Sequence, residues 1–198
     1  MKIGVLSLQG AFLEHEKMLQ RLGIDTVEVR QRKDLDAIDG IVLPGGESTV
    51  QGQLLRELDM LEPLRQKIQA GLPVLATCAG LILLAEHIAD DPTTHLATLP
   101  ITVKRNAYGR QLSSFSTAAD VGRLKDFPLV FIRAPYIADV NKGAEDETST
   151  DAVQVLVRVD GKIVGVRTAN QIGLAFHPEL TDDTRLHEAF VAMVKSKN

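Results

Sequence analysis

Short apolar runs alternate with helical patterns through about the first ninety residues of this chain. Each run holds only a few aliphatic residues, which is too short for a buried helix and typical of a buried strand. Glycine, proline or a polar cluster separates it from the helical pattern that follows. The alternation predicts an α/β fold, in which a mostly parallel sheet is flanked by helices in three layers. In this part we expect strands at residues 3–8, 27–29, 41–43 and 73–77, and helices at 11–22, 49–58, 62–70 and 81–88.

The second half of the chain is richer in β-branched residues and turns. Asp160-Gly161 is a strong signal for a hairpin, so we expect some antiparallel strands beside the parallel ones. A last helix with apolar residues at helical spacing is expected at 182–195. Because no linker or repeat divides the chain, we expect residues 1–198 to form a single domain. The strands expected here are 101–104, 115–119, 129–132, 153–159, 162–166 and 172–176.

The composition argues against several classes of protein. With 44% hydrophobic and 24% charged residues, the chain is neither disordered nor collagen-like. A formal net charge of −4 provides no basic field for a nucleic acid, and no apolar run is long enough to span a membrane, so we expect neither partner. A single cysteine without an export signal points to the cytoplasm. The cysteine and histidine spacing predicts no metal site.

The only cysteine, Cys78, lies where the strand at 73–77 meets Ala79-Gly80 and the next helix. A tight strand-to-helix turn exposes a side chain, and the helix start favours a thiolate over a thiol. His177 and Glu179 follow the last predicted strand, where the imidazole could take a proton and the carboxylate could orient the ring. Both segments end strands at the sheet edge where ligands bind, and together they predict a Cys-His-Glu triad. Taken alone, each could be a packing residue.

A second loop at the same edge is Pro44-Gly45-Gly46-Glu47-Ser48. Its glycines allow backbone amides to point toward a bound group, which suits an oxyanion hole beside a nucleophile. Taken alone, the segment could equally be a tight turn in which Ser48 caps the following helix. A phosphate-binding loop is a weaker interpretation, because the Gly-Lys-Ser/Thr ending is missing.

Five short motifs are spread over the chain: Pro44-Gly45-Gly46-Glu47-Ser48-Thr49, Thr77-Cys78-Ala79-Gly80-Leu81, Arg105-Asn106 with Gly109-Arg110-Gln111, Phe131-Ile132-Arg133-Ala134-Pro135 and Phe176-His177-Pro178-Glu179-Leu180. Together they resemble the triad (class I) glutamine amidotransferases, and more closely the glutaminase subunits of pyridoxal phosphate synthase. The resemblance covers nearly the whole chain, from Gly4-Val5-Leu6 through His177-Pro178-Glu179. It implies the flavodoxin-like fold of that class.

The resemblance also implies hydrolysis of L-glutamine to L-glutamate and ammonia. Cys78 would attack the side-chain amide carbon, His177 would protonate the departing ammonia and then activate water, and Glu179 would hold the ring. Backbone amides would hold the developing oxyanion, and charged groups would meet the α-carboxylate and α-amine of glutamine. The implied oxyanion-hole residues are Gly45, Gly46 and Ala79, and the implied substrate contacts are Gly46, Glu47, Ser48, Arg105, Ile132 and Arg133.

The same resemblance implies a partner protein. Ammonia released into neutral water becomes ammonium, which has no lone pair for attack, so such a glutaminase is useful mainly when it is docked on an acceptor enzyme. The implied partner is the synthase subunit of pyridoxal phosphate synthase, within a large hetero-oligomer that serves vitamin B6 biosynthesis. This chain would then hold no cofactor. Gln9 and Gly10 are candidates for the docking surface. We classify the expected activity as a hydrolase and also as a lyase.

Three other functions fit parts of the pattern. The chain could be a triad amidotransferase subunit that serves another synthase, a cysteine peptidase or esterase with the same elbow, or a noncatalytic scaffold that binds a partner. Arg105 and Arg133, taken alone, could be surface or strand-end residues. The remaining histidines lie on predicted helices or loops without matching partners, so we expect surface or packing roles for them. They are His15, His87, His95 and His187.

Overall fold

A computed structural model describes residues 1–105, 114–141 and 152–197 of the chain. The motif residues Asn106, Gly109, Arg110 and Gln111 lie outside the described residues.

The first half of the chain builds a parallel sheet. Its strands are β1 (Lys2–Leu6), β2 (Asp25–Val29), β3 (Gly40–Leu43) and β4 (Val74–Thr77), which are joined by β12 (Gln171–Leu174) from near the end of the chain. They lie in the order β2-β1-β3-β4-β12, and each neighbouring pair is parallel. This is the strand order of a flavodoxin-like sheet, so the predicted fold class is confirmed.

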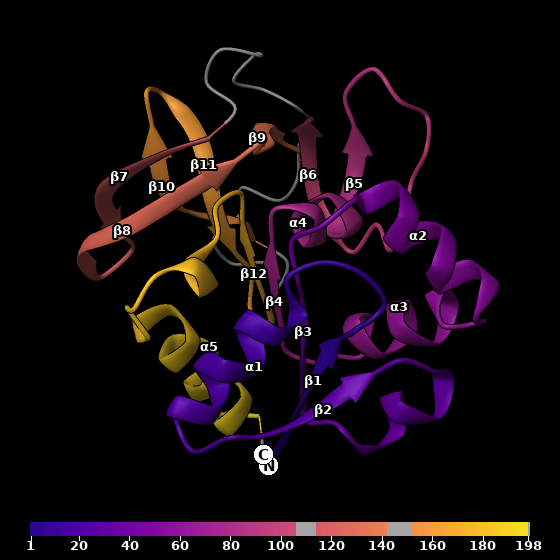
Figure 1. Ribbon diagram of the computed structural model, residues 1–198. Coiled ribbons are helices and arrows are strands. Elements are labelled where there is room, and N and C mark those ends of the chain that lie inside the picture. The colour runs from indigo at the N-terminus through magenta and orange to yellow at the C-terminus, as the bar shows by residue number, and fades with distance from the viewer. Residues whose placement is uncertain (106–113, 142–151, 198) are drawn as a thin grey trace.

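Beyond β12 the sheet continues with antiparallel pairs, as the turn-rich second half of the sequence predicts, except that its last pair, β5 with β6, is parallel. These strands are β5 (Ala85–Ile88), β6 (Leu99–Lys104), β9 (Tyr136–Val140), β10 (Gln154–Val159) and β11 (Lys162–Arg167). β11 pairs antiparallel with β12, β10 and β9, and the hairpin at Asp160-Gly161 joins β10 to β11. A separate antiparallel ribbon consists of β7 (Ser114–Val121) and β8 (Leu124–Ile132), which extends across β10 in Figure 1.

Helices cover both faces of the parallel sheet (Figure 1). On one face lie α1 (Phe12–Arg21) and α5 (Arg185–Lys195), and on the other lie α2 (Ser48–Glu57), α3 (Leu61–Gln69) and α4 (Ala79–Leu84). Short 3-10 helices are η1 (Arg32–Ala37) and η2 (Pro178–Leu180). The inner strands β1, β3, β4 and β12 are mostly apolar and buried on both faces, as expected for a sheet between two helical layers, whereas the edge strand β2 is only partly buried.

Three local predictions are wrong. The helix expected at 81–88 ends at Leu84, because the next residues pair parallel with β6 as β5. Ser48 is the first residue of α2 and not its cap, which is Glu47. The sequence analysis also missed β9, whose short run contains polar residues and is held mainly by pairing with β6.

Candidate active site

The nucleophile candidate lies at a strained turn between β4 and α4. Cys78 has φ 46° and ψ −99°, a left-handed conformation that a non-glycine residue rarely adopts. Its backbone N–H donates to the Leu174 carbonyl at the end of β12, 2.8 Å away, which fixes the turn. A Cβ at Gly80 would lie 2.1 Å from the Leu43 carbonyl oxygen, so only glycine lets α4 start this close to β3.

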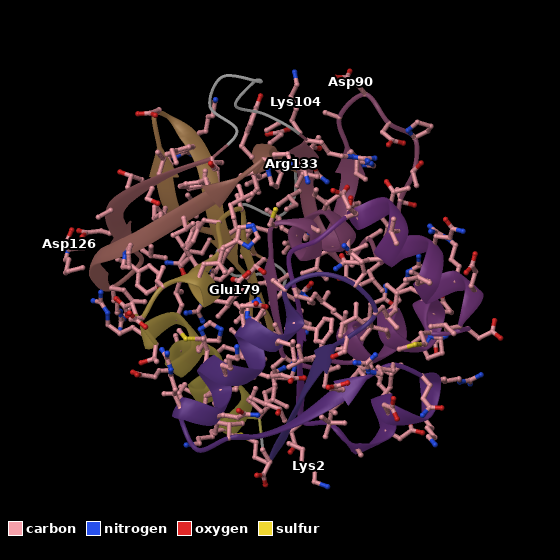
Figure 2. The ribbon with its side chains drawn as sticks, in the orientation of Figure 1. Lys2, Asp90, Lys104, Asp126, Arg133 and Glu179 are labelled. Carbon is pink, nitrogen blue, oxygen red and sulfur yellow. The ribbon has the colours of Figure 1, made fainter. Side chains whose placement is uncertain are left out.

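His177 and Glu179 follow β12 and face the same sheet edge. The His177 backbone N–H donates to the Val130 carbonyl of β8 at 2.8 Å, which fixes this segment. His177 Nδ1 donates to Glu179 Oε1 at 2.6 Å, and the ring interacts with the Cys78 side chain, which helps to raise the pKa of the imidazole. The three side chains predicted as a triad therefore meet in the structure. Figure 2 shows Glu179 in the middle of the molecule, with Arg133 nearer its upper edge.

The surroundings of His177 favour its charged form. Burial alone would lower the pKa of the imidazole, but hydrogen bonds to Cys78 and Glu179 and the charges of these groups raise the pKa to about 10. An imidazolium next to a cysteine stabilises a thiolate. The geometry thus suits a thiolate–imidazolium pair with a carboxylate behind the ring.

A pocket of about 390 Å³ opens over these side chains. This volume suits a small polar ligand. All of the predicted substrate and oxyanion-hole residues line it, as do Gln9, Gly10, Cys78 and His177. The start of α2 also faces it, since Ser48 and Thr49 are among the lining residues, and a helix N-terminus favours a negatively charged group.

The glycine loop lies against the imidazole. A Cβ at Gly45 would come within 2.3 Å of His177 Cε1, so a side chain here would displace the ring. The Gly45 N–H donates to Thr77 Oγ1 at 3.0 Å and is already engaged. In the described part of the chain, no hydrogen bond occupies the N–H of Gly46 or Ala79. These two amides are the available donors for an oxyanion.

The loop that carries Gln9 and Gly10 supports the glycine loop. Gln9 Oε1 accepts from the Glu47 N–H at 2.8 Å, and the Ala11 N–H donates to the Gly45 carbonyl at 3.0 Å. The two residues predicted as docking candidates therefore line the pocket and help to hold its wall.

Charged side chains at the pocket mouth are exposed or partly exposed. Arg133 lies 3.1 Å from the Glu47 carboxylate, and each side chain is more than half exposed, at 70% and 58%. Arg105 donates to Thr49 Oγ1 at 3.3 Å and pairs with Asp91. Ile132 follows on the same rim and is 41% exposed, and its carbonyl lies 3.9 Å from Cys78 Sγ. This mouth offers both signs of charge to a zwitterionic ligand.

Two histidines that the sequence analysis assigned to surface or packing roles lie directly behind Glu179. His15 of α1 is fully buried, with Nε2 3.1 Å from Thr77 Oγ1 and 3.4 Å from Glu179 Oε2. Its Nδ1 lies 3.0 Å from Nε2 of His187, which is also fully buried on α5. The available signal was a polar ring on the apolar face of each helix, and only the fold brings the two rings together.

Burial determines the protonation of the inner layer, which consists of Glu179, His15 and His187. It lowers the pKa of His15, and burial together with the neighbouring His15 lowers the pKa of His187 to about 3, so both rings are neutral at pH 7. Burial alone would raise the pKa of Glu179, but His15 and the hydrogen bond from His177 hold it below its usual range. Glu179 is therefore the single charged group of this layer.

The other two histidines lie away from these groups. His95 is buried, and its pKa is lowered to about 4 by burial and by Arg56 and Arg105, whereas His87 is exposed on β5. In the described ranges no cluster of side chains has the composition of a metal site. No helix of these ranges has the length and apolar character needed to cross a membrane.

A search against protein-family models matches residues 5–196 to the SNO glutamine amidotransferase family. The chain belongs to this family. The resemblance inferred from the five motifs is thus confirmed.

Curated members of the SNO family are similar over nearly their full length. The chain is 59% identical over 192 residues to the pyridoxal 5'-phosphate synthase subunit PdxT of Desulfitobacterium hafniense (strain Y51), covering 96% of this chain and 92% of that protein. It is 48% identical over 202 residues to the subunit of the same name from Streptococcus pneumoniae (strain ATCC 700669 / Spain 23F-1), covering 100% of both.

Solved structures agree with the family. A crystal structure described as a glutamine amidotransferase superposes with a TM-score of 0.89 at 40% identity and covers 98% of both chains. A putative GMP synthase subunit from Thermoplasma acidophilum superposes with a TM-score of 0.69 at 19% identity over 100% of this chain and 95% of that one, which shows the shared fold alone.

The predicted assignment to the lyases is wrong. The family and its curated relatives are glutamine amidotransferases and subunits of a synthase. A glutaminase cleaves an amide by adding water across the C–N bond, which is the chemistry of a hydrolase.

Proposed function

We propose that this protein is the glutaminase subunit of a pyridoxal 5'-phosphate synthase and hydrolyses L-glutamine to L-glutamate and ammonia. The observation that carries the proposal is the continuous series of Cys78, His177 and Glu179 at the base of a pocket that carries both signs of charge at its mouth. The names of the curated relatives agree with this function.

In the first half of the reaction, the Cys78 thiolate attacks the side-chain amide carbon of glutamine. A C–S bond forms, and the carbonyl oxygen becomes an oxyanion, which the amides of Gly46 and Ala79 are placed to hold. His177 donates its Nε2 proton to the amide nitrogen. The C–N bond then breaks, ammonia leaves, and a glutamyl thioester remains on Cys78.

In the second half, water attacks the thioester carbon. The neutral imidazole of His177 takes a proton from this water, and the C–S bond breaks to restore the thiolate–imidazolium pair. The γ-carboxylic acid that is released loses its proton to solvent to give glutamate. Glu179 holds the ring with Nδ1 protonated and Nε2 facing the substrate in both halves. Each step uses only the triad, glutamine and water.

The charges at the mouth account for the choice of an amino acid. We assign Arg133 and Arg105 to the α-carboxylate of glutamine and Glu47 to its α-amine, because a guanidinium pairs well with a carboxylate. The start of α2, with Ser48, adds further positive potential for the carboxylate. The Glu47–Arg133 contact then exchanges for contacts to the substrate.

The surface around the pocket suits a protein partner. Among the large apolar side chains that are exposed by 41–49%, two line the pocket, and another two lie within two residues in sequence of residues that line it. A group of exposed apolar side chains marks an interaction site. The four are Leu13, Val50, Ile132 and Leu180. We propose that the synthase subunit docks here, over the loop of Gln9 and Gly10, and receives ammonia before water protonates it. The mechanism requires a free thiol, so we place the enzyme in a reducing compartment, the cytoplasm.

We further infer that residues 1–198 act as one catalytic unit, because Gln9 near the start of the chain and Leu180 near its end line the same pocket.

The test is ammonia release from glutamine by the wild-type chain and by Cys78→Ala, each with and without the synthase subunit. We expect turnover by the wild type that rises when the synthase is present and a loss of at least about 10⁴-fold in Cys78→Ala. Equal rates for the two proteins would overturn the proposal. Hydrolysis of peptides or esters in preference to glutamine would instead support a peptidase or esterase.

A further inference from the structure

One oxygen of the triad carboxylate has no hydrogen bond in the described part of the chain. Glu179 Oε1 accepts from His177, whereas Oε2 is buried without a hydrogen-bond partner of ordinary geometry. A charged oxygen kept from water requires a donor nearby. The polar atom that faces it is His15 Nε2, at 3.4 Å, and both side chains are fully buried.

The neighbours of His15 select one tautomer. If Nδ1 carried the proton, it would donate to His187 Nε2, and the buried Nδ1 of His187 would hold a proton without an acceptor. His15 Nε2 would then direct a lone pair at the Glu179 carboxylate. If instead Nε2 carries the proton, His187 Nε2 donates to Nδ1, and the Nε2–H points toward Thr77 and Glu179. The second arrangement avoids both the unpaired N–H on His187 and the lone pair that faces the carboxylate. It leaves only a lone pair on His187 Nδ1 unused, which costs less free energy than a buried unpaired N–H.

We propose that His15 is a positioning residue of the glutaminase, whose Nε2–H is shared between Thr77 Oγ1 and Glu179 Oε2 and holds the carboxylate against His177. The role rests on the proposed function, because it is exerted through the triad. His187 acts one step further away, since its Nε2–H fixes the tautomer of His15.

The His15 ring contacts groups on both sides of the pocket. Thr77 Oγ1, which contacts His15 Nε2, also accepts the N–H of Gly45 in the glycine loop. One side chain on α1 therefore holds the carboxylate on one side and the wall of the pocket on the other. The charges that act on the ring are those of Glu179, His177 and Glu14.

Two polar variants of similar size separate positioning from packing. In His15→Gln, the amide NH₂ lies near the original position of Nε2 and can still donate to Glu179, whereas in His15→Asn it lies near Nδ1 and cannot. We expect kcat for glutamine, with the synthase present, within about threefold of wild type for Gln and about 10- to 100-fold lower for Asn, with KM nearly unchanged in both. Equal values of kcat for Gln and Asn would overturn the proposal.

A second measurement needs neither turnover nor the synthase. Cys78 is the only cysteine, so its rate of alkylation by iodoacetamide against pH reports the thiolate alone. If Glu179 loses its orientation, the imidazolium is less stabilised, and the thiolate requires a higher pH to form. We expect the midpoint to rise by about one pH unit in His15→Asn and by less in His15→Gln and His187→Leu. The buried control variant His95→Gln should keep the wild-type midpoint. If the His15 and His187 variants also keep the wild-type midpoint, the proposal is wrong.

The tautomer itself is open to measurement in the wild-type chain, whatever the variants do. Ring ¹⁵N chemical shifts should show His15 protonated at Nε2 and not at Nδ1 near pH 7. The opposite assignment contradicts the proposal even if a His15 variant fails to fold. If the wild type with synthase releases no ammonia, the proposed function fails, but the tautomer and the alkylation profile still test His15 separately.

Discussion

The polar contacts at the base of the pocket are buried, whereas those at its mouth are exposed to solvent. At the base, Glu179, His15 and His187 are fully buried and contact one another through a series of ring nitrogens and carboxylate oxygens. At the mouth, Glu47 and Arg133 form a pair that is more than half exposed to solvent. Buried polar contacts are strong and fixed, whereas exposed pairs are weak and exchange readily. The base is therefore suited to holding catalytic geometry, and the mouth to exchanging its internal contact for a substrate.

The largest effect is expected when the Glu179 carboxylate at the base is neutralised. In Glu179→Gln, the amide no longer holds His177 with Nδ1 protonated, and a buried charge that stabilises the imidazolium is lost. We expect kcat to fall by about 10³- to 10⁴-fold with little change in KM, measured as glutamate release with the synthase present. Glu188→Gln, an exposed change on α5, is the control and should retain full activity. A loss confined to KM would mean that Glu179 binds substrate.

A smaller loss of kcat is expected when the glycine loop beside His177 is altered. In Gly45→Ala, the new methyl group would lie 2.3 Å from His177 Cε1, so the ring has to shift. A displacement of this size costs about 10²-fold in kcat. Steady-state kinetics measure it, and thermal unfolding shows whether the fold is retained. An unchanged kcat in a folded variant would show that catalysis does not depend on this position of the His177 imidazole.

At the mouth, the effect should appear in binding. Arg133→Gln removes a charged partner for the α-carboxylate of glutamine, a hydrogen bond worth about 1.5–3 kcal/mol, so we expect KM to rise about 10- to 100-fold. The melting temperature should stay within about 2 °C, because the exposed pair with Glu47 adds little to stability. The control Arg158→Gln, on β10, should leave KM unchanged. A fall in kcat with constant KM would contradict the division between mouth and base.

The smallest effect concerns stability against pH. The pKa of His187 is lowered from 6.5 to about 3, so its neutral form stabilises the folded state above pH 6.5, and this contribution is lost as the pH falls toward 3. Between pH 6 and 4, the unfolding free energy of the wild type should therefore fall more steeply than that of His187→Leu, by up to about 1.4 kcal/mol per pH unit. Urea titrations measure it, with the exposed His87→Leu as control. Parallel curves for wild type and His187→Leu would show that His187 is already protonated.

The sequence predicted the base and the mouth with unequal success. Motifs local in the chain identified Cys78, His177 and Glu179, because strand ends in a parallel sheet meet at one edge. His15 and His187 are 172 residues apart in sequence and lie on different helices, so their pairing depends on how α1 and α5 pack on one face of the sheet. Helical periodicity indicates which residues share one face of a helix, but it does not tell which helices become neighbours.

The fold shows a similar limit. The inner parallel strands were predictable because they are mostly apolar and each is followed by a clear turn or helix. β5 and β9 were not, since their sequences are partly polar and their strand conformation depends on pairing with β6. Local patterns thus determined the elements that are buried on both faces, while tertiary pairing determined the others.

The central claim is that the Cys78 thiolate forms a covalent bond to the substrate. Its most direct test is intact-protein mass spectrometry after rapid mixing of the chain and its synthase with glutamine, followed by an acid quench. We predict a glutamyl group attached to Cys78, which accumulates in Gly45→Ala or Glu179→Gln if hydrolysis slows more than attack, and which is absent in Cys78→Ala. Turnover of glutamine without any such adduct on Cys78, or with the adduct on another residue, would contradict the account.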